Sequence, residues 1–262
     1  MRQMLKPLAL LLMAGFAITS CKKEVKDSSQ EQISQETLTK ISNLGFSTAD
    51  VQQVDEGYLV EGDIIITPEY LNSNSKWMTL RVGTEEQYST NNLVTSLPRV
   101  ISVSVSGSVS TAFSDAVNHA IARYNQQNLS ITFSRVSSGG DIVIRIVNTG
   151  QYIASSGFPT NSGDPYNTVK YAKKYTTYSD GFMTTVLTHE MGHCIGFRHT
   201  DYMNRSYSCG IGGNEGDGGV GANYIPGTAS GPDAGSWMLA CLSSTTNRPF
   251  NSNDVKALDY LY

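Results

Sequence analysis

The spacing of hydrophobic residues changes several times along the chain, and each spacing predicts a different element. Ile101, Val103 and Val105 alternate with serines, which is typical of a strand with one buried face. In residues 110–128 the apolar positions recur every three to four residues, which predicts an amphipathic helix with Ser110 as its N-cap. The apolar face of that helix comprises Phe113, Val117, Ala120, Ile121 and Tyr124.

Strand and helix patterns continue beyond this helix. Residues 130–136 and 141–147 predict two further strands, and the second is apolar on both faces, as is typical of a central strand. Residues 168–171 predict an edge strand because they carry a lysine, and residues 180–196 predict a second long helix. This order of elements indicates an α/β domain whose sheet is flanked by helices.

The N-terminal part of the chain has shorter patterns. Residues 33–46 allow a short helix, and residues 47–50 resemble the start of a second one. Residues 58–66 predict either a strand pair or one bent strand, broken at Gly62. Residues 71–98 are rich in Asn, Ser and Thr and show no sustained period. We therefore expect a small separate region that ends within this last stretch.

The first residues of the chain predict export. Arg2 and Lys6 precede an apolar run over residues 8–18, which has the length of a signal-peptide core. The run is too short for a transmembrane helix, which needs about 20 apolar residues. Small residues then lead into Cys21, which resembles the lipobox of bacterial lipoproteins, where the cysteine is lipidated. An ordinary cleavage site beside a chance cysteine is the alternative.

Composition narrows the classes of protein further. The 262-residue chain has a net charge of -4 and 16% charged residues, so it lacks the basic surplus of a nucleic-acid-binding protein. Its four cysteines are too few for a disulfide framework at this length. Each cysteine is therefore interpreted by its position.

Three of the four histidines fall within eleven residues. His189 and His193 are four residues apart on a predicted helix and so share a face, where both imidazoles can bind one ion. Glu190 lies about 60° around the helix axis from His193. Its carboxylate is therefore expected beside the ion, where it can take a proton from bound water.

A glycine allows the third histidine to join this pair. Gly196 is the residue that most easily takes the left-handed turn that ends a helix, so the chain can bend back and bring His199 to the same ion. Three histidines and one water form the open arrangement of a catalytic zinc site, because a structural site fills all four positions with protein ligands. The fourth histidine, His119, is interpreted as a solvated surface side chain.

The segment from His189 to His199 resembles the extended zinc motif of the metzincins, HExxHxxGxxH, at every fixed position. Its His-Glu-Met-Gly-His-Cys-Ile-Gly form is most similar to the bacterial dual-action HEIGH metallopeptidases. The resemblance covers about residues 98–262. It implies an α/β (α+β) zincin catalytic domain with a twisted mixed sheet, an active-site helix and a backing helix. A small C-terminal subdomain with a methionine turn and a terminal helix would follow.

The resemblance also implies roles for single residues. Met238 lies about 40 residues after His199 and fits the methionine that packs beneath the metal in metzincins. Ala240 stands where some metzincins have a tyrosine ligand, so no such ligand is implied. The implied reaction is hydrolysis of internal peptide bonds by a zinc-bound water that Glu190 activates. A zinc-containing binding lipoprotein without turnover is the alternative function.

Several polar residues near the motif have more than one interpretation. Asp201 could orient a ligand histidine or accept a backbone hydrogen bond in its turn. The acidic residues Asp164, Glu215, Asp217 and Asp233 could bind Ca²⁺, although solvated loop carboxylates are the simpler interpretation.

The remaining cysteines are interpreted from the exported location. Cys209 and Cys241 stand at the two ends of a glycine-rich loop that would line the substrate pocket, and we expect them to form a disulfide. Cys194 is about 100° around the helix from His193 and is expected to be a buried free thiol.

These inferences divide the chain into a lipoprotein signal peptide (1–20), a tether and pro-region (21–95) and a catalytic domain (96–262). We expect a monomer, anchored by lipid in a bacterial outer membrane or at the cell surface, that acts on protein or peptide substrates. Two roles are open for the pro-region. It could be a folding aid or spacer, which we favour, or it could block the zinc with a carboxylate such as Asp63, because no cysteine follows Cys21 within it.

Overall fold

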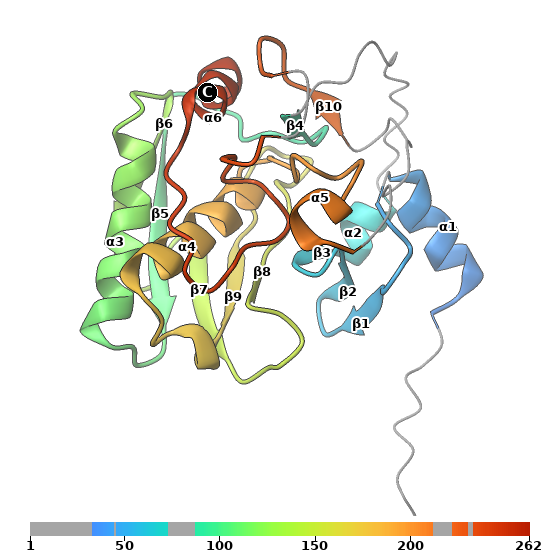
Figure 1. Ribbon diagram of the computed structural model, residues 1–262, viewed down its shortest axis with the longest axis horizontal. Coiled ribbons are helices and arrows are strands. Elements are labelled where there is room, and N and C mark those ends of the chain that lie inside the picture. Colours follow the sequence, from blue (N-terminus) through green and yellow to red (C-terminus); the bar gives the residue numbers. More distant parts are fainter. Residues whose placement is uncertain (1–32, 45, 73–86, 212–221, 230–232) are drawn as a thin grey trace, which may run out of the picture. The chain divides into compact units, whose positions relative to one another are not determined.

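A five-stranded sheet organises the larger part of the computed structural model (Figure 1). The structure describes residues 33–262 except 45, 73–86, 212–221 and 230–232. The sheet has the order β6-β5-β7-β9-β8 and is parallel except for β8, which runs antiparallel to β9. Its strands are β5 (Arg99–Ser106), β6 (Ile131–Arg135), β7 (Ile142–Val147), β8 (Ala154–Ser155) and β9 (Thr168–Ala172).

The predicted strands of the sheet are present, but one of them has a different place in the sheet from the one predicted. β7 is central, as its two apolar faces indicated, and β5 buries Ile101 and Val103 through the alternation with serines. However, β9 is not an edge strand, because β8 pairs with its outer side through Ala154↔Tyr171. A two-residue strand has no periodicity to detect in a sequence, so this edge was invisible.

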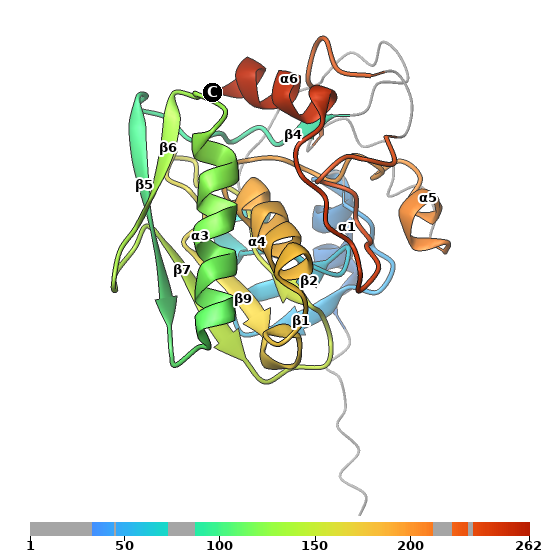
Figure 2. The same cartoon turned by 60° about the vertical axis from the view of Figure 1, so that its left-hand side comes forward.

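Two long helices lie side by side on one face of the sheet (Figure 2). α3 (Thr111–Asn125) begins at the predicted N-cap, where the Ser110 hydroxyl accepts a hydrogen bond from the backbone N–H of Phe113. α4 (Asp180–Cys194) is capped in the same way by Ser179. Every residue of α4 from 182 to 194 is buried. Packing on all sides therefore holds the segment that carries the metal-binding motif.

The described residues from 33 to 72 form two short helices and three short strands. These are α1 (Gln35–Asn43), β1 (Gln52–Val54), β2 (Gly57–Val60), β3 (Ile64–Ile66) and α2 (Pro68–Leu71). The predicted helix over residues 33–46 is confirmed, but the predicted second helix at residues 47–50 is wrong. Asp50 has a φ of 58°, and the chain turns there into β1 instead. A left-handed residue stops a right-handed helix from starting.

β2 and β3 pair as an antiparallel hairpin, so the strand pair predicted over residues 58–66 is confirmed. We call residues 57–66 the N-terminal hairpin and its loop, Glu61–Gly62–Asp63, the hairpin tip. The hairpin begins at Gly57, where a side chain would meet the Ile66 carbonyl oxygen at 2.2 Å. The apolar residues of this part cluster with Phe158 from the rest of the protein.

The remaining described part of residues 87–262 forms the main body. Beyond the sheet it contains β4 (Tyr88–Ser89), η1 (Lys173–Tyr175), α5 (Ser206–Cys209), β10 (Asn223–Tyr224) and α6 (Ser252–Leu261). β4 pairs with β10, and the Gln87 amide donates to Asp254 on α6. Residues 87–89 are thus built into the main body. The predicted division between residues 95 and 96 stays a prediction.

The C-terminal helix completes the hydrophobic core. Asn251 and Asp254 form a capping box at the start of α6. The hydroxyl of Tyr262 donates to the carbonyl of Ile195, just after α4. Within the described ranges, the structure contains no helix that is long and apolar enough to cross a membrane.

Candidate active site

Two of the three predicted ligands are held in position by backbone carbonyl groups. His189 Nδ1 lies 2.9 Å from the carbonyl oxygen of Trp237, and His193 Nδ1 lies 2.8 Å from that of Phe197. A carbonyl oxygen can only accept, so each Nδ1 carries the proton and each Nε2 has a lone pair. Both Nε2 atoms are buried and have no hydrogen-bond partner among the described residues. Two lone pairs left without donors in this way fit a bound metal ion.

The third histidine reaches the site because of the turn at Gly196. This residue has a φ of 108°, and a Cβ there would lie 2.8 Å from the Asn92 carbonyl oxygen. The Phe197 N–H then bonds back to the Gly192 carbonyl at 2.9 Å, which reverses the chain after α4. The predicted bend is confirmed, and it places the His199 ring 4.9 Å from that of His193.

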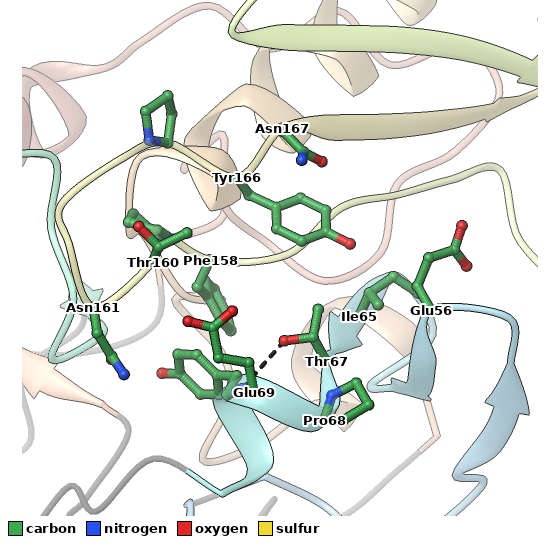
Figure 3. A pocket seen from close by; sticks show the side chains of 13 residues that line it. Glu56, Ile65, Thr67, Pro68, Glu69, Phe158, Thr160, Asn161, Tyr166 and Asn167 are labelled. Carbon is green, nitrogen blue, oxygen red and sulfur yellow. Dashed lines mark hydrogen bonds between the residues drawn. The ribbon is translucent and has the colours of Figure 1, made fainter.

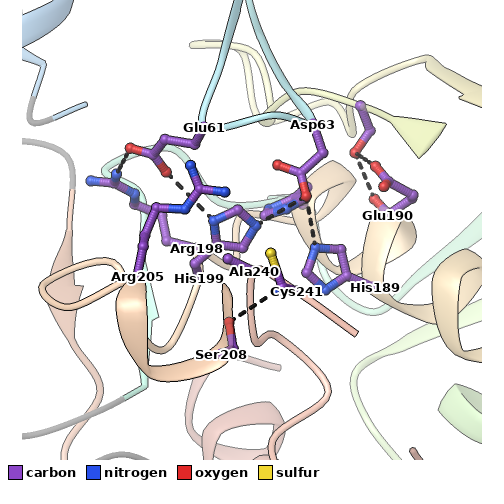
Figure 4. A network of polar contacts seen from close by, with 12 residues as sticks. Glu61, Asp63, His189, Glu190, Arg198, His199, Arg205, Ser208, Ala240 and Cys241 are labelled. Atoms are coloured by element: carbon purple, nitrogen blue, oxygen red, sulfur yellow. Dashed lines mark hydrogen bonds and ion pairs between the residues drawn. The ribbon is translucent and has the colours of Figure 1, made fainter. Parts of the chain in front are cut away.

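A carboxylate from the N-terminal hairpin completes the cluster (Figure 4). One ligand atom each from Asp63, His189, His193 and His199 lie within 4.8 Å of one another, so that one ion could be shared by all four. Asp63 Oδ2 is 3.2 Å from His199 Nε2 and 3.5 Å from His189 Nε2. Three imidazoles and one carboxylate are a ligand set that zinc accepts.

The electrostatics of the cluster favour a neutral His193 beside a charged Asp63 carboxylate. Burial, with added repulsion from His189 and His199, holds the pKa of His193 well below its usual range. Burial alone would raise the pKa of Asp63, but its close contacts with His199 and His189 outweigh that effect. The pKa of Asp63 is therefore well below its ordinary value. These are the protonation states that metal ligands require.

Glu190 lies next to the cluster with one polar partner that the sequence did not reveal. Its side chain is buried, and the Ser156 hydroxyl donates to Glu190 Oε2 at 2.6 Å. Burial, with the nearby charge of Asp63, raises the pKa of Glu190 well above its ordinary value, although the Ser156 bond acts in the opposite direction. A carboxylate with a raised pKa is suited to accept a proton. Ser156 lies in a Gly- and Ser-rich loop, where nothing in the pattern distinguishes it.

Met238 packs beneath the active-site helix, as predicted. It is fully buried, and a Cβ at Gly192 would lie 2.7 Å from its sulfur. The Met238 carbonyl accepts from the N–H of Thr200, next to the third histidine. The preceding Trp237 supplies the carbonyl that orients His189. The turn thus supports the ligands without contributing one.

Asp201 ties the segment after the third histidine to the methionine turn. Its carboxylate accepts from the Ala240 N–H at 2.9 Å and from the Ser208 hydroxyl at 2.5 Å. Of the two interpretations, the backbone acceptor fits these contacts, although the N–H belongs to Ala240 rather than to Asp201's own turn. The disulfide between Cys209 and Cys241 is present beside this link.

The other predicted residues have ordinary roles or lie outside the described residues. Cys194 is a buried free thiol, and His119 is exposed and pairs with Asp180 at 2.9 Å. Of the possible calcium ligands, Asp164 pairs with Arg99 at 2.8 Å and Asp233 accepts from the amides of two asparagines. Glu215, Asp217 and the predicted lipidation site Cys21 lie outside the described residues.

Two further groups near the metal cluster were missed from the sequence. Arg198 Nη2 lies 2.9 Å from Glu61 Oε1 of the hairpin tip, and both side chains are completely buried. The ring of Phe158 stands edge-on to that of His193, with centroids 5.6 Å apart. Glu61 and Arg198 are 137 residues apart in the sequence. Only an alignment that showed them varying together could have revealed the pair.

Three convergent histidines, a buried glutamate beside them and a methionine turn beneath define a zinc metallopeptidase site on a mixed α/β fold. Residues 58–262 match the family model described as "Dual-action HEIGH metallo-peptidase". The chain belongs to this family. The matched region begins in β2 and therefore includes the hairpin tip.

Two other comparisons complete this result. A search of curated proteins found no match. Among solved structures, "Structure of myroilysin" is similar with a TM-score of 0.45 and 16% identity, over 65% of this chain and 96% of that chain. A second, "Crystal structure of myroilysin", has a TM-score of 0.32 and 18% identity, over 52% of this chain and 59% of that chain.

Proposed function

We propose that this metallopeptidase is an exported endopeptidase in which Glu190 activates the attacking water, and that the N-terminal hairpin keeps it latent. The observation that carries the proposal is the position of Glu190. Its buried carboxylate follows the first ligand directly in the chain and lies in the same pocket as His189 and Asp63.

Each residue of the site has a distinct part in this reaction. Zinc, when held by His189, His193 and His199, lowers the pKa of a water molecule and polarises the scissile carbonyl. Glu190 removes a proton from the water and delivers it to the leaving amine. Ser156 holds the Glu190 carboxylate through the 2.6 Å hydrogen bond. No side chain becomes covalently attached to the substrate.

The contacts of the hairpin support cleavage within a chain rather than at its end. β3 lies along the sheet edge beyond β8, where the Ile65 N–H donates to the Ser156 carbonyl and the Ser156 N–H donates to the Asp63 carbonyl. An extended peptide can add to a sheet edge in the same way. The chain continues in both directions from Asp63, which is the situation of an internal segment of a substrate.

Two hollows lie beside the site. One, of about 190 Å³, is lined by Ile153, Val186 and Leu242 together with His189. The other, of about 410 Å³, is bordered by Phe158 and by β3 and α2 of the N-terminal part (Figure 3). The N-terminal hairpin forms part of the wall of both hollows, so they widen when the hairpin leaves.

Latency is proposed from the place that Asp63 takes. Its carboxylate oxygen lies among the three histidines, and there it would compete with a water molecule for the fourth position of a zinc ion held by them. Of the two roles left open for the pro-region, this contact favours blocking over a spacer. Activation would then require the hairpin to leave.

Export and lipid anchoring are part of the proposal and rest on the sequence. The apolar run over residues 8–18 and the small residues before Cys21 support a lipoprotein signal. A cell-envelope location also agrees with the disulfide between Cys209 and Cys241.

The decisive experiment compares casein cleavage by residues 22–262 before and after trimming of the N-terminal region, with and without a zinc chelator. The Glu190→Gln variant is measured beside it. We expect activity after trimming that chelator abolishes, and a fall of about 10²- to 10⁴-fold in the variant, which keeps its zinc. Full activity in the variant would exclude Glu190 as the base. Bound zinc without activity in any form would favour the binding protein without turnover.

A further inference from the structure

The Glu61 carboxylate occupies a closed site in the main body beside the metal cluster. Arg198 Nη2 lies 2.9 Å from Glu61 Oε1, and His199 Nδ1 lies 3.5 Å from Glu61 Oε2. Neither the Glu61 nor the Arg198 side chain is exposed to solvent. The Tyr202 ring faces the guanidinium from the main body, 5.0 Å from its centre, and the Phe46 ring faces it at 4.2 Å. The site is therefore built to enclose one carboxylate.

The backbone of the hairpin tip is bent to deliver that carboxylate. Glu61 has a φ of 56°, in the left-handed region that is unfavourable for a residue with a side chain. The next residue, Gly62, has a φ of 93°. The tip thus places two carboxylates, Glu61 and Asp63, in two adjacent sites (Figure 4). One of these sites is the metal cluster, and the other is centred on Arg198.

Under the proposed function, one side of the Arg198 site stays in the active enzyme and the other side leaves with the N-terminal part. Arg198, His199 and Tyr202 are in the main body and stay when the hairpin leaves. Glu61 and Phe46 are in the N-terminal part and leave. A buried guanidinium is costly to keep without an anion, so the departure favours entry of another carboxylate. Arginine is the side chain best shaped to bind one with two parallel hydrogen bonds.

On this basis, and resting on the proposed function, we infer that Arg198 forms a substrate subsite that selects a carboxylate next to the bond to be cut. In the latent protein, Glu61 occupies the place that the substrate carboxylate would take. Arg198 immediately precedes the ligand His199, and Glu61 is two residues from the carboxylate at the metal cluster. The selected group therefore binds within about two residues' reach of the metal. An acidic side chain and a free C-terminus both supply this chemistry.

The experiment uses the full chain with Glu61→Gln and Asp63→Asn, which removes both hairpin carboxylates. Quenched peptides that differ only in Glu or Gln are compared, with the position varied around the cleaved bond. We expect kcat/KM to be at least about tenfold higher for one Glu peptide than for its Gln partner, the size of a hydrogen-bonded charge pair. A second pair, with a free or an amidated C-terminus, tests which source of carboxylate is preferred.

Substitution of the arginine should remove this preference. In the Glu61→Gln background, Arg198→Gln leaves no buried charge unpaired, so the fold should be kept. Arg198→Lys keeps the positive charge but cannot form the two parallel hydrogen bonds of a guanidinium group, so it should retain part of the preference. Arg99→Gln, which alters a surface arginine paired with Asp164, should leave the preference unchanged. Equal kcat/KM for the matched peptides, or a preference that survives Arg198→Gln, would overturn the inference.

A binding measurement separates this inference from the proposed function. Adding Glu190→Gln to the hairpin variant prevents turnover, and the affinity of the same peptides is then measured by fluorescence anisotropy. Tighter binding of the carboxylate peptides, lost in Arg198→Gln, supports the subsite even if no peptide is ever cleaved. Absence of any difference in affinity, together with chelator-sensitive cleavage, would reject the subsite and leave the endopeptidase intact. Absence of binding altogether would also reject the subsite.

Discussion

The active-site helix α4 and the N-terminal hairpin meet at the same cluster, but they are held there in different ways. α4 is buried over residues 182–194, and carbonyl groups of the main body fix the rings of His189 and His193. The hairpin tip reaches the cluster through two carboxylates: Glu61 pairs with Arg198, and Asp63 Oδ2 lies 3.2 Å from His199 Nε2. Packing holds both regions, and the hairpin tip adds two carboxylate contacts that α4 does not have. A catalytic element must persist through turnover, and an inhibitory one must be able to leave.

The largest expected effect tests the stability of the main body, on which α4 depends. Asp254 is completely buried under the methionine turn, and burial raises its pKa to about 7, despite hydrogen bonds from Asn251, Ser236 and Trp237. The folded protein therefore binds a proton that the unfolded chain, with a carboxyl pKa of 3.8, releases. This stabilisation is complete below pH 4 and is lost as the pH rises to about 7. It amounts to roughly 4 kcal/mol in total.

Urea unfolding at several pH values checks this. In Asp254→Asn, this part of the pH dependence should disappear. The variant should also be less stable at low pH by about 1–3 kcal/mol, because its amide would face the donors Gln87 and Trp237. Asp259→Asn, at an exposed position on the same helix, should keep the wild-type slope. An unchanged slope in Asp254→Asn would show that another group titrates.

The turn after α4 should be the next most sensitive feature. Gly196→Ala puts a Cβ 2.8 Å from the Asn92 carbonyl oxygen at a φ of 108°. We expect a loss of about 2–4 kcal/mol from strain and overpacking, measured by thermal unfolding, together with loss of bound zinc as His199 moves. Gly227→Ala has a φ of 88° and nothing within 4 Å, so it measures the backbone strain alone. Equal losses in both variants would contradict the clash.

Removal of the Asp63 charge should weaken the inhibition by the hairpin. Asp63→Asn in the full chain weakens the contacts with His189 and His199, and we expect casein cleavage to rise by about 10- to 100-fold. Asp55→Asn, in the exposed turn between β1 and β2, is the matched control and should leave the activity unchanged. If activity stayed equally low in both variants, the hairpin would act as a folding aid or spacer instead.

The difference between the two regions also explains how far the sequence alone could lead. The ligands lie on one helix and the turn after it, so their spacing shows their common face, and Gly196 marks the bend. The role of Met238 was implied by the resemblance to metzincins, and the disulfide was expected from the export signal and from the position of Cys209 and Cys241 at the ends of the glycine-rich loop. The contacts of Glu61, Arg198 and Ser156 join parts of the chain that only the folded structure brings together. No periodicity records such contacts, and the edge strand β8 was missed because two residues have no period.

Ser156 is the residue where the two regions touch, and it gives the smallest but most discriminating prediction. Its backbone bonds to the hairpin at Asp63 and Ile65, while its hydroxyl donates to Glu190 Oε2 at 2.6 Å. Ser156→Ala removes the contacts of the hydroxyl with Glu190 Oε2 and with the Glu190 carbonyl but keeps the backbone bonds, so kcat/KM of the trimmed enzyme should fall about tenfold, with the zinc content unchanged. The rate at which the N-terminal region is trimmed should not change, because the backbone bonds to the hairpin remain.

Ser155→Ala is the matched control for this experiment. The neighbouring hydroxyl is buried and has no hydrogen-bond partner among the described residues, so its removal should leave both the activity and the trimming rate unchanged. A Ser156→Ala variant that is trimmed faster but cleaves normally would mean that Ser156 serves the hairpin rather than the base. The hydroxyl would then belong to the mechanism of latency, and Glu190 would have to be held by burial alone.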